Sequence, residues 1–495
     1  MGNPSNDSKP KFKRCFYCRK LKSLNEIHES PIKCNCYGCN TRKKESLKRF
    51  LSDFGVCDQC YKAITKFTSS GNEDIDNFIR STLLIYDVRL DFAPFDKFKD
   101  LKFIAEGGFS KIYKATWIDG PITTWNCEKQ EYNRHANKTV VLKELNDSKN
   151  INSEQLNEIK IFHTLSNHNV YAKKSKRNYY EYVNKYYGIT QHPESKNYMI
   201  IMNYCESGDL TRYITKDFFN IKWYNKLNKL DDIISGLKEI HNAGITHQDY
   251  HSGNIFLLAS TPIMGDLGLS KSAIESTNDE NKEVYGIIPY VAPEIFRGEK
   301  YTKASDIYSF GMIMWELMTG RKPFWNYNHD TSLIIEIWDG LRPPVITNAP
   351  EGYVKLMKKC WRSDPSKRPT ANNIYNKIQA MLEKEWKDTT EIIESSNIGP
   401  ITTVNPDAIY KSRLLSIMII SAENTINIKK IDKRRLDEFF ENDENDENEI
   451  IRKKLFKYEI NNDYLTKELE FDIDNNINKF YNKDLYITKE IKFDI

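Results

Sequence analysis

Two short segments near the middle of the chain, ITHQDYHSGNIFLL and MGDLGLS, constrain its fold more than any other feature. The first, residues 245–258, places a polar loop between two apolar runs, a pattern typical of two strands joined by a loop. The loop contains Asp249 and Asn254, and the second segment contains Asp266 in a glycine-flanked turn. Carboxylate and amide oxygens are ligands that Mg2+ prefers, and a separate carboxylate could accept a proton from an attacking hydroxyl. The two segments therefore predict that Asn254 and Asp266 bind magnesium and that Asp249 is a general base.

A glycine-containing segment, LKFIAEGGFSKIYKATW, begins at Leu101. Its alternating apolar residues predict two strands joined by a turn at Gly107 and Gly108, where backbone amides could approach phosphate oxygens. Farther along, the run VVLK predicts a strand that ends at Lys143, a cation that could meet a phosphate. Glu158 follows in a helical pattern, and it either turns toward Lys143 or is a surface residue of an amphipathic helix.

The order of these segments resembles the protein kinase superfamily from Ile104 to Arg368. Three later segments extend the resemblance: APE at residues 292–294, SDIYSFG at residues 305–311, and DPSKRPT, which contains Arg368. The resemblance implies an α+β, two-lobed protein-kinase fold, with a β-rich lobe over residues 98–202 and a helical lobe over residues 207–385. It also implies transfer of the γ-phosphoryl group of ATP to protein hydroxyls, with Mg2+ as cofactor.

The resemblance implies a role for individual residues. Lys143 would hold the α- and β-phosphates, Glu158 would anchor Lys143, and Asp249 would orient and deprotonate the acceptor hydroxyl. Asn254 and Asp266 would bind two Mg2+ ions that bridge the phosphates. The nucleotide would also lie against a further set of residues, with Met202 behind the adenine and Cys205 in the hinge: Ile104, Gly107, Gly108, Ser110, Ile112, Met202 and Cys205. A structural ion pair would join Glu294 to Arg368.

The chain departs from the family pattern at several positions. Ala105 and Ser110 stand where the phosphate-binding loop usually has its first and third glycines, which would weaken phosphate binding without abolishing it. Gln248 replaces the arginine that grips a phosphorylated activation-loop residue, so we predict activity that does not require this phosphorylation. His251 and Ile287 replace a lysine and a threonine that serine/threonine kinases usually carry near the catalytic aspartate.

The acceptor residue follows from the branch of the family. The domain most resembles the tyrosine-kinase-like branch, whose members usually phosphorylate Ser or Thr, and YVAPE at residues 290–294 points the same way. We therefore predict a serine/threonine kinase in intracellular signalling, with tyrosine or dual specificity as an alternative. A second alternative is a pseudokinase scaffold that binds nucleotide or partners without catalysis. The residues that pseudokinases commonly lose, Lys143, Asp249 and Asp266, are all present.

The N-terminal region predicts a zinc module. Seven of the ten cysteines form three Cys-x2-Cys pairs and one additional thiol: Cys15, Cys18, Cys34, Cys36, Cys39, Cys57 and Cys60. This spacing is typical of zinc ligands, and a structural Zn2+ would help so short a segment to fold as a small zinc-ribbon-like unit. One grouping uses the first and last pairs for one ion and His28, Cys34, Cys36 and Cys39 for another, and other groupings of four are open. The alternative is a disordered basic arm with reduced thiols.

The same region is basic. Residues 9–49 hold thirteen Lys and Arg against three Glu, whereas the whole chain has 73 basic and 69 acidic residues. Basic charge around zinc knuckles suits nucleic acid, acidic proteins or anionic lipid, so targeting to nucleic acid through residues 9–49 is an alternative function. Such a charged surface is more often simply solvated.

Composition divides the chain into four regions: the cysteine-rich module (1–65), a connector (66–97), the kinase domain (98–385) and a low-complexity tail with a short repeat (386–495). The longest apolar stretch, residues 414–422, falls far short of the ~18 residues of a membrane helix, and the N-terminus has no apolar signal region. We expect a cytoplasmic protein, with a nuclear location left open, whose partners are ATP and protein substrates. Cys127, Cys205 and Cys360 lack metal-site spacing and are interpreted as structural thiols.

Overall fold

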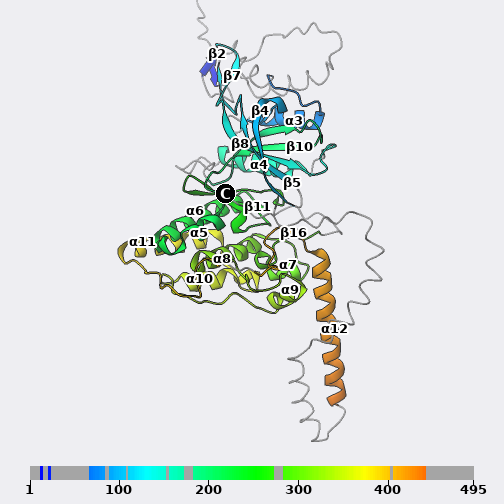
Figure 1. Cartoon of the computed structure of the whole chain (residues 1–495), viewed down its shortest axis with the longest axis vertical. Coiled ribbons are helices and arrows are strands. Elements are labelled where there is room, and N and C mark those ends of the chain that lie inside the picture. Colours follow the sequence, from blue (N-terminus) through cyan, green and yellow to red (C-terminus); the bar gives the residue numbers. More distant parts are fainter. Residues whose placement is uncertain are drawn as a thin grey trace, which may run out of the picture. The chain divides into compact units, whose positions relative to one another are not determined.

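The computed structural model describes residues 12–14, 21–23, 66–83, 89–107, 110–126, 128–151, 155–171, 182–272, 283–401 and 405–441. The chain divides into two compact units, Met1–Ala422 and Glu423–Ile495. The first unit contains a β-sheet lobe followed by a helical lobe, as expected for the two-lobed α+β kinase fold (Figure 1). Near the N-terminus, β1 (Phe12–Arg14) pairs antiparallel with β2 (Leu21–Ser23).

The N-terminal lobe is built on a six-stranded sheet with the strand order β3-β9-β10-β8-β5-β4. Strand β3 runs parallel to β9, and the other neighbouring pairs are antiparallel. The strands are β3 (Asp91–Phe92), β4 (Phe98–Glu106), β5 (Ser110–Trp117), β8 (Lys138–Leu145), β9 (Tyr186–Gln191) and β10 (Tyr198–Asn203). The two strands predicted around Gly107 are therefore confirmed, and the Gly107 amide donates a 2.8 Å hydrogen bond to the carbonyl of Ser110.

The connection between β5 and β8 forms a hairpin of its own, β6 (Ile122–Asn126) with β7 (Glu131–Arg134). The rings of Trp125 and Tyr132 meet edge-on across the hairpin, with centroids 4.9 Å apart. Arg134 forms an ion pair with the carboxylate of Asp91 on β3. The hairpin is thus anchored to the edge of the main sheet.

Strand β10 contributes to two separate cores. Its sequence, YMIIMN, is apolar at four consecutive positions and is buried along its whole length. Successive side chains of a strand point to opposite faces, so Met199 and Ile201 pack into a small cluster that contains Trp117. Ile200 and Met202 belong to the larger core, which includes the buried face of α4 (Asn157–Tyr171).

Helix α3 (Glu73–Leu83) lies in the region that we assigned to the connector. Ile75, Ile79 and Leu83 share one face of this helix, and none of them is more than 2% exposed. They join the core that contains the buried residues of α4, and the ring of Phe78 meets the ring of His163 on α4 with centroids 5.9 Å apart. Helix α3 is therefore a packed element of the N-terminal lobe.

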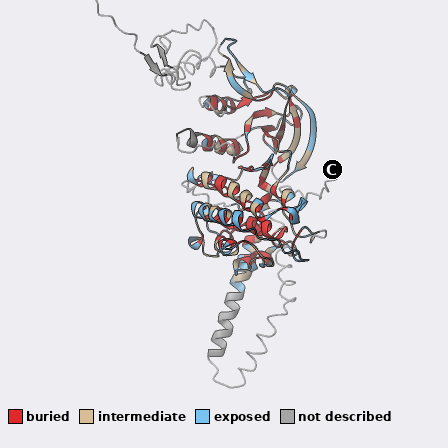
Figure 2. Ribbon diagram, turned by 90° about the vertical axis from the view of Figure 1, so that its left-hand side faces the viewer, coloured by how far each residue is buried: buried red, intermediate tan, exposed pale blue. Residues whose placement is uncertain are grey.

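The C-terminal lobe is helical and has α8 (Lys303–Thr319) at its centre. Every residue of α8 from Ser305 to Thr319 is buried, and the buried residues of the neighbouring helices face inward (Figure 2). A capping box at Thr302 begins the helix, and Gly320 ends it in the left-handed conformation with φ of 73°. The surrounding helices are α5 (Leu210–Lys216), α6 (Trp223–Asn242), α7 (Pro293–Phe296), α9 (Thr331–Trp338), α10 (Tyr353–Cys360) and α11 (Ala371–Lys387).

Short strand pairs hold the loops of the predicted site. These are β11 (Ile245–Thr246) with β14 (Lys271–Ser272), and β12 (Ile255–Leu258) with β13 (Thr261–Met264). The predicted strand, polar loop and strand over residues 245–258 are confirmed as β11, the loop with Asp249, and β12. After α11 the described chain continues against the lobe to β16 (Arg413–Leu414), which pairs with β15 (Tyr285–Gly286), and then enters α12 (Ser416–Glu441).

Candidate active site

Lys143, Glu158 and Asp266 meet between the two lobes. The Lys143 ammonium lies 2.8 Å from the Glu158 carboxylate on α4 and 2.8 Å from the Asp266 carboxylate, which follows β13. Lys143 and Glu158 are buried, and Tyr186 donates a 2.8 Å hydrogen bond to the second oxygen of Glu158. Glu158 therefore turns inward, toward Lys143, and is not the surface residue that we had left as an alternative.

Lys143 and Asp266 stabilise the charged form of each other. Burial alone would lower the pKa of Lys143. The negative charges of Asp266 and Glu158 have the larger effect and raise the pKa above its ordinary value. Partial burial would raise the pKa of Asp266, yet the Lys143 ammonium and the Gly268 amide lower it. Lys143 is therefore a cation and Asp266 an anion at neutral pH.

The carboxylate of Asp306 on α8 binds the backbone of the loop that follows β11. One oxygen of Asp306 accepts a 2.9 Å hydrogen bond from the His247 amide, and the other accepts one of 3.0 Å from the Gln248 amide. Gln248 has φ of 69° and Asp266 has φ of 51°, both in the left-handed region that non-glycine residues rarely adopt. The backbone is thus strained at Asp266 and at the residue before Asp249. Strained residues of this kind cluster at functional sites.

Asp249 and Asn254 lie within hydrogen-bonding distance of each other. The Asn254 amide nitrogen is 3.0 Å from the Asp249 carbonyl oxygen and 3.3 Å from its carboxylate. Both side chains are largely buried, with 8% and 9% of the residue surface exposed. Because its nitrogen is engaged by Asp249, Asn254 presents its amide oxygen as the remaining polar atom.

His251 lies against the same carboxylate. Its Nδ1 accepts a 3.1 Å hydrogen bond from the Gly253 amide, and its Nε2 is 3.7 Å from the Asp249 carboxylate. A neutral imidazole whose Nδ1 accepts a hydrogen bond carries its proton on Nε2. His251 therefore directs an N–H group toward Asp249 from the position where the kinase pattern usually has lysine.

The residues predicted to contact nucleotide belong to adjacent strands of the N-terminal sheet. Ile112 on β5 pairs directly with Lys143 on β8, which pairs with Ile200 on β10, so the three side chains share one face. Met202 is buried at the end of β10, and Cys205 follows, where burial raises the pKa of the thiol to about 11. Ile104, Gly107 and Ser110 lie on or beside the β4–β5 hairpin, and Gly108 is outside the described residues.

Sequence reasoning did not single out two side chains that organise this site. The Tyr186 hydroxyl donates a hydrogen bond to Glu158, and Asp306 accepts hydrogen bonds from the loop after β11. Asp306 lies in the SDIYSFG segment that we used for the resemblance, but we gave it no individual role. A carboxylate in a largely apolar helix indicates a buried charge with specific partners. The ion pair predicted between Glu294 and Arg368 is confirmed, with two hydrogen bonds of 2.6 Å between side chains that are at most 1% exposed.

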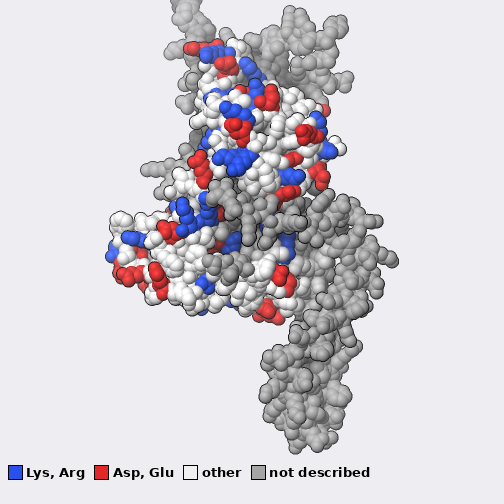
Figure 3. Space-filling view, in the orientation of Figure 1, with Lys and Arg blue, Asp and Glu red and all other residues white. Residues whose placement is uncertain are grey.

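The zinc prediction falls outside the residues that the structure describes. Within the described ranges, no group of three or more His, Cys, Asp and Glu side chains is arranged to hold a metal ion. All seven N-terminal cysteines lie beyond those ranges, as does Cys127. Acidic and basic side chains are interspersed over the described part of the face drawn in Figure 3. No helix in the described part of the chain has the length and apolar character needed to cross a membrane.

Proteins named as kinases or probable kinases resemble part of the chain. It is 33% identical over 197 residues to the probable serine/threonine-protein kinase roco5 of Dictyostelium discoideum, covering 37% of this chain and 7% of that protein. It is 29% identical over 336 residues to roco6 of the same organism, another probable serine/threonine-protein kinase, covering 64% and 14%. It is 28% identical over 258 residues to a protein kinase and PP2C-like domain-containing protein of Arabidopsis thaliana, covering 45% and 39%. The chain thus spans only a minor part of the length of these relatives.

Residues 98–378 match the family model described as protein tyrosine and serine/threonine kinase. The match covers more than half of the chain, and it includes strands β4 to β10 of the N-terminal lobe, most of the helical lobe and every charged residue of the site described above. The chain therefore belongs to the protein tyrosine and serine/threonine kinase family.

Proposed function

We propose that this chain is an active protein kinase that transfers the γ-phosphoryl group of ATP to Ser or Thr residues of proteins. The observation that carries the proposal is the contact of the Lys143 ammonium with both Glu158 and Asp266, each at 2.8 Å. This contact connects the sheet, α4 and the loop after β13. Phosphoryl transfer depends mainly on positioning and charge neutralisation, and an assembled cluster of this kind supplies both.

The side chains fit the cofactor that such a reaction needs. One carboxylate oxygen of Asp266 accepts hydrogen bonds from Lys143 and the Gly268 amide. The side-chain nitrogen of Asn254 is bonded to Asp249, so its amide oxygen is available as a ligand. Both are hard oxygen ligands of the kind that Mg2+ selects, and Asp266 and Asn254 would hold it. When bound, Mg2+ neutralises charge on the phosphate oxygens of ATP.

On the acceptor side, Asp249 would receive the proton of the attacking hydroxyl. Its carboxylate is held by the Asn254 amide and lies beside Nε2 of His251. Lys143 would bind the phosphates of the nucleotide. We propose Ser or Thr as the acceptor because the relatives that resemble this domain are named serine/threonine kinases.

The test is phosphate transfer from γ-labelled ATP with Mg2+ by the purified full chain, followed by phosphoamino-acid analysis. We expect label on phosphoserine or phosphothreonine, and a loss of at least a hundredfold in Asp249→Asn, since general-base groups contribute about 10²–10⁴ in rate. Asp339→Asn makes the same chemical change at an exposed position and should retain full activity. Label on tyrosine would overturn the acceptor assignment.

A binding measurement separates the kinase from a pseudokinase scaffold. If the parent chain binds ATP with Mg2+ but transfers no label to itself or to a general substrate, the chain is a scaffold and the catalytic proposal fails. If ATP binding is lost in Lys143→Met and retained in Asp249→Asn, the assignment of the nucleotide-binding residues is supported independently of turnover.

We further propose that the N-terminal cysteines bind structural Zn2+. The support is the spacing of the three Cys-x2-Cys pairs. Elemental analysis of the full chain should find bound zinc, and the double substitution Cys57→Ser with Cys60→Ser should reduce the amount. Cys127→Ser, which changes a cysteine without a paired partner in the sequence, should leave the zinc content unchanged. Absence of zinc from the parent chain would refute this proposal.

The basic N-terminus offers a second candidate function, binding of nucleic acid. Its support is the excess of Lys and Arg over Glu in residues 9–49. Binding through phosphate contacts weakens steeply with salt. A titration of single-stranded RNA and duplex DNA at low and physiological salt should show that dependence. Absence of binding at low salt would remove this candidate.

A further inference from the structure

We call residues 266–294, from the DLG segment to the APE segment, the activation segment. Its strand β15 is paired with a strand from outside the predicted kinase domain of residues 98–385. In β15, Tyr285 lies opposite Leu414 and Gly286 opposite Arg413 of β16. The Leu415 amide donates a 2.7 Å hydrogen bond to the Val284 carbonyl. The Val284 amide in turn donates to the Ser416 hydroxyl at 2.9 Å. We call residues 405–422, which include β16, the C-terminal strap.

The strap is bound to the helical lobe at several further points. The His329 amide donates to the Asp407 carbonyl at 3.0 Å, and Arg413 donates to the His329 carbonyl. The Tyr410 hydroxyl donates to the Pro323 carbonyl at 2.8 Å. Three apolar residues of the strap, Leu415, Ile419 and Ala422, are at most 7% exposed and belong to the main core. The strap is therefore an integral part of the lobe.

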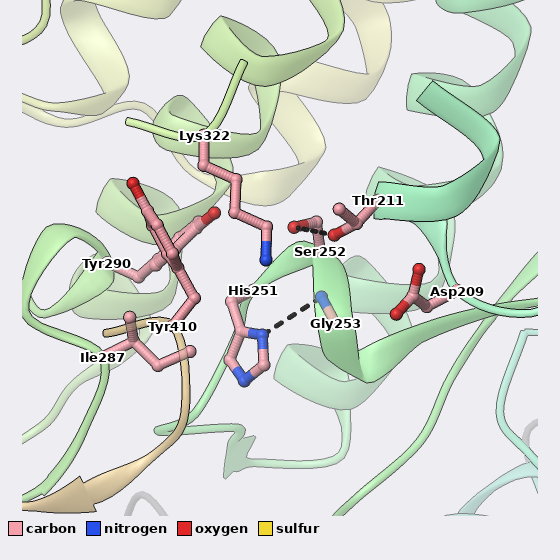
Figure 4. A pocket seen from close by; sticks show the side chains of 9 residues that line it. All are labelled: Asp209, Thr211, His251, Ser252, Gly253, Ile287, Tyr290, Lys322 and Tyr410. Carbon is pink, nitrogen blue, oxygen red and sulfur yellow. Dashed lines mark hydrogen bonds between the residues drawn. The ribbon is translucent and has the colours of Figure 1, made fainter. Parts of the chain in front are cut away.

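The strap also contributes to a pocket beside the catalytic loop. Figure 4 shows this pocket, of about 110 Å3, with Tyr410 forming one wall and Lys322 pointing into it. The catalytic loop supplies His251, Ser252 and Gly253, and the activation segment supplies Ile287 and Tyr290. The Lys322 ammonium lies 4.6 Å from the centre of the Tyr410 ring, which places the cation over the ring face.

The position of the pocket suits an acceptor peptide. His251 lines the pocket and also lies 3.7 Å from the Asp249 carboxylate, the proposed base. A protein substrate that presents its hydroxyl to Asp249 would therefore place a neighbouring residue in this pocket. Tyr410 borders the pocket and does not fill it, so the strap leaves room for that residue.

Gln248 of the catalytic loop does not hold the activation segment in place, as the arginine usual at this position would through a phosphorylated residue. The side-chain Nε2 of Gln248 donates a 3.0 Å hydrogen bond to the hydroxyl of Thr246, two residues earlier in the chain. Gln248 is also neutral, and it cannot make a charge-assisted contact to a phosphorylated residue. Strand pairing through β16 holds the activation segment without a phosphate.

We propose that the C-terminal strap is an intramolecular activator of this kinase: it fixes the activation segment through β16 and completes the acceptor pocket with Tyr410. The inference rests on the proposed kinase function. Two observations favour activation over occlusion. The Lys143 cluster is assembled while the strap is bound, and the strap leaves the pocket lined by His251 unfilled.

The decisive experiment releases the strap in the full chain with Leu415→Asp. Leu415 is fully buried, so a carboxylate there opposes docking. Ile393→Asp, at a position 64% exposed and outside the strap, is the matched control. We expect Leu415→Asp to accelerate hydrogen exchange at residues 283–290, to lower kcat/KM for the acceptor at least tenfold, and to leave the affinity for ATP within twofold. Ile393→Asp should change none of the three.

Two further variants test Tyr410 without disturbing the buried anchor. Tyr410→Phe keeps the ring and loses the bond to Pro323, whereas Tyr410→Ala removes the wall of the pocket. We expect Tyr410→Ala to raise KM for the acceptor severalfold with a smaller effect on kcat, and Tyr410→Phe to lie near the parent. The activity of the parent should also survive phosphatase treatment.

The outcomes separate this inference from the proposed function. Higher activity in Leu415→Asp would make the strap an inhibitor and overturn the inference. Unchanged exchange at residues 283–290 would do the same, because the strap would then not hold the activation segment. If the parent transfers no phosphate, the proposed function fails, and hydrogen exchange alone still decides whether the strap fixes that segment.

Discussion

His251 is the residue at which this site differs most in chemistry from the usual serine/threonine pattern. Its Nε2–H faces the Asp249 carboxylate because its Nδ1 is engaged by the Gly253 amide. We predict that His251→Leu lowers kcat severalfold, because it removes a polar N–H group 3.7 Å from the Asp249 carboxylate, a contact longer than a hydrogen bond. Because His251 lies on the acceptor side, KM for ATP should stay close to that of the parent.

Steady-state kinetics with ATP and acceptor varied separately would measure this effect. His251→Lys restores a donor at the same position and should recover part of kcat. If His251→Leu is as active as the parent, His251 does not position Asp249.

Lys226 on α6 is a buried cation in an aromatic environment. Its ammonium lies 3.8 Å from the ring centre of Phe218 and 5.1 Å from that of Trp223, and it has no hydrogen-bond partner among the described residues. Burial lowers the pKa of Lys226 to about 7. We predict that Lys226→Met stabilises the protein at pH 7 by about 2–5 kcal/mol, since one pKa unit corresponds to ~1.4 kcal/mol.

Urea denaturation of the parent and Lys226→Met would give this difference in unfolding free energy. Lys358→Met, at an exposed position of α10, is the control for the change of residue type and should leave the unfolding free energy unchanged. A destabilised Lys226→Met would mean that the contacts of the ammonium with the two rings outweigh the cost of its burial.

At the scale of residues, the sequence predicts the groups whose order along the chain is characteristic. Lys143, Glu158, Asp249, Asn254 and Asp266 lie in short motifs, and the structure places each on the expected strand, helix or loop. The partners of those groups are not predictable in the same way. Tyr186 is one of two adjacent tyrosines in β9, and only its hydrogen bond to Glu158 gives it a role.

Among the elements, α3 has the clearest consequence for the site, because it packs against the helix that carries Glu158. Ile79, at the middle of its buried face, is fully buried. We predict that Ile79→Ala lowers the unfolding free energy by about 2–5 kcal/mol, the usual range for such truncations in a core. Looser packing of α4 should also weaken the Lys143–Glu158 contact and lower ATP affinity.

Thermal unfolding and ATP titration of the same variant would test the two effects. Ser81→Ala changes an exposed residue of α3 and should alter neither quantity. If Ile79→Ala unfolds more easily yet binds ATP as the parent does, α3 contributes to stability without positioning α4.

The C-terminal strap shows why some elements escape sequence reasoning. Residues 414–422 form a nearly continuous apolar run, LLSIMIISA. Leu415, Ile419 and Ala422 are buried at helical spacing, while Ile417 is 65% and Ile420 57% exposed. Because the exposed side of the run is as apolar as the buried side, its pattern does not identify the buried face or its partner.

For the whole molecule, two buried ionisable groups predict an unusual dependence of stability on pH. Burial raises the pKa of Glu316 from 4.5 to about 7, so the folded state holds a proton there that the unfolded state releases. Stability from Glu316 is therefore present below pH 4.5 and is lost as pH rises to 7. Lys226 acts in the opposite direction: its pKa falls from 10.5 to about 7, so stability increases as pH rises from 7 to 10.5.

We predict that the contributions of Glu316 and Lys226 to stability are together lowest near pH 7. Unfolding free energies at several pH values would be compared for the parent, Glu316→Gln, Lys226→Met and the double variant. Glu316→Gln should remove the fall on the acid side, and Lys226→Met should remove the rise on the alkaline side. A parent curve that the substitutions leave unchanged in shape would contradict the prediction.

The pairing of β15 with β16 joins residues that are made at different times. Tyr285 and its partner Leu414 are separated by more than a hundred positions. The helical lobe is complete only when Lys387, the last residue of α11, has been made, and Leu414 follows 27 positions later. At a synthesis rate of about 5–20 residues per second, the strap is therefore made roughly 1–5 seconds after the rest of the lobe. During that interval the catalytic residues are already present, but the strap that would complete the acceptor pocket is not. We therefore expect the nascent chain to reach its full activity toward proteins only after the strap has been made and has docked on the lobe.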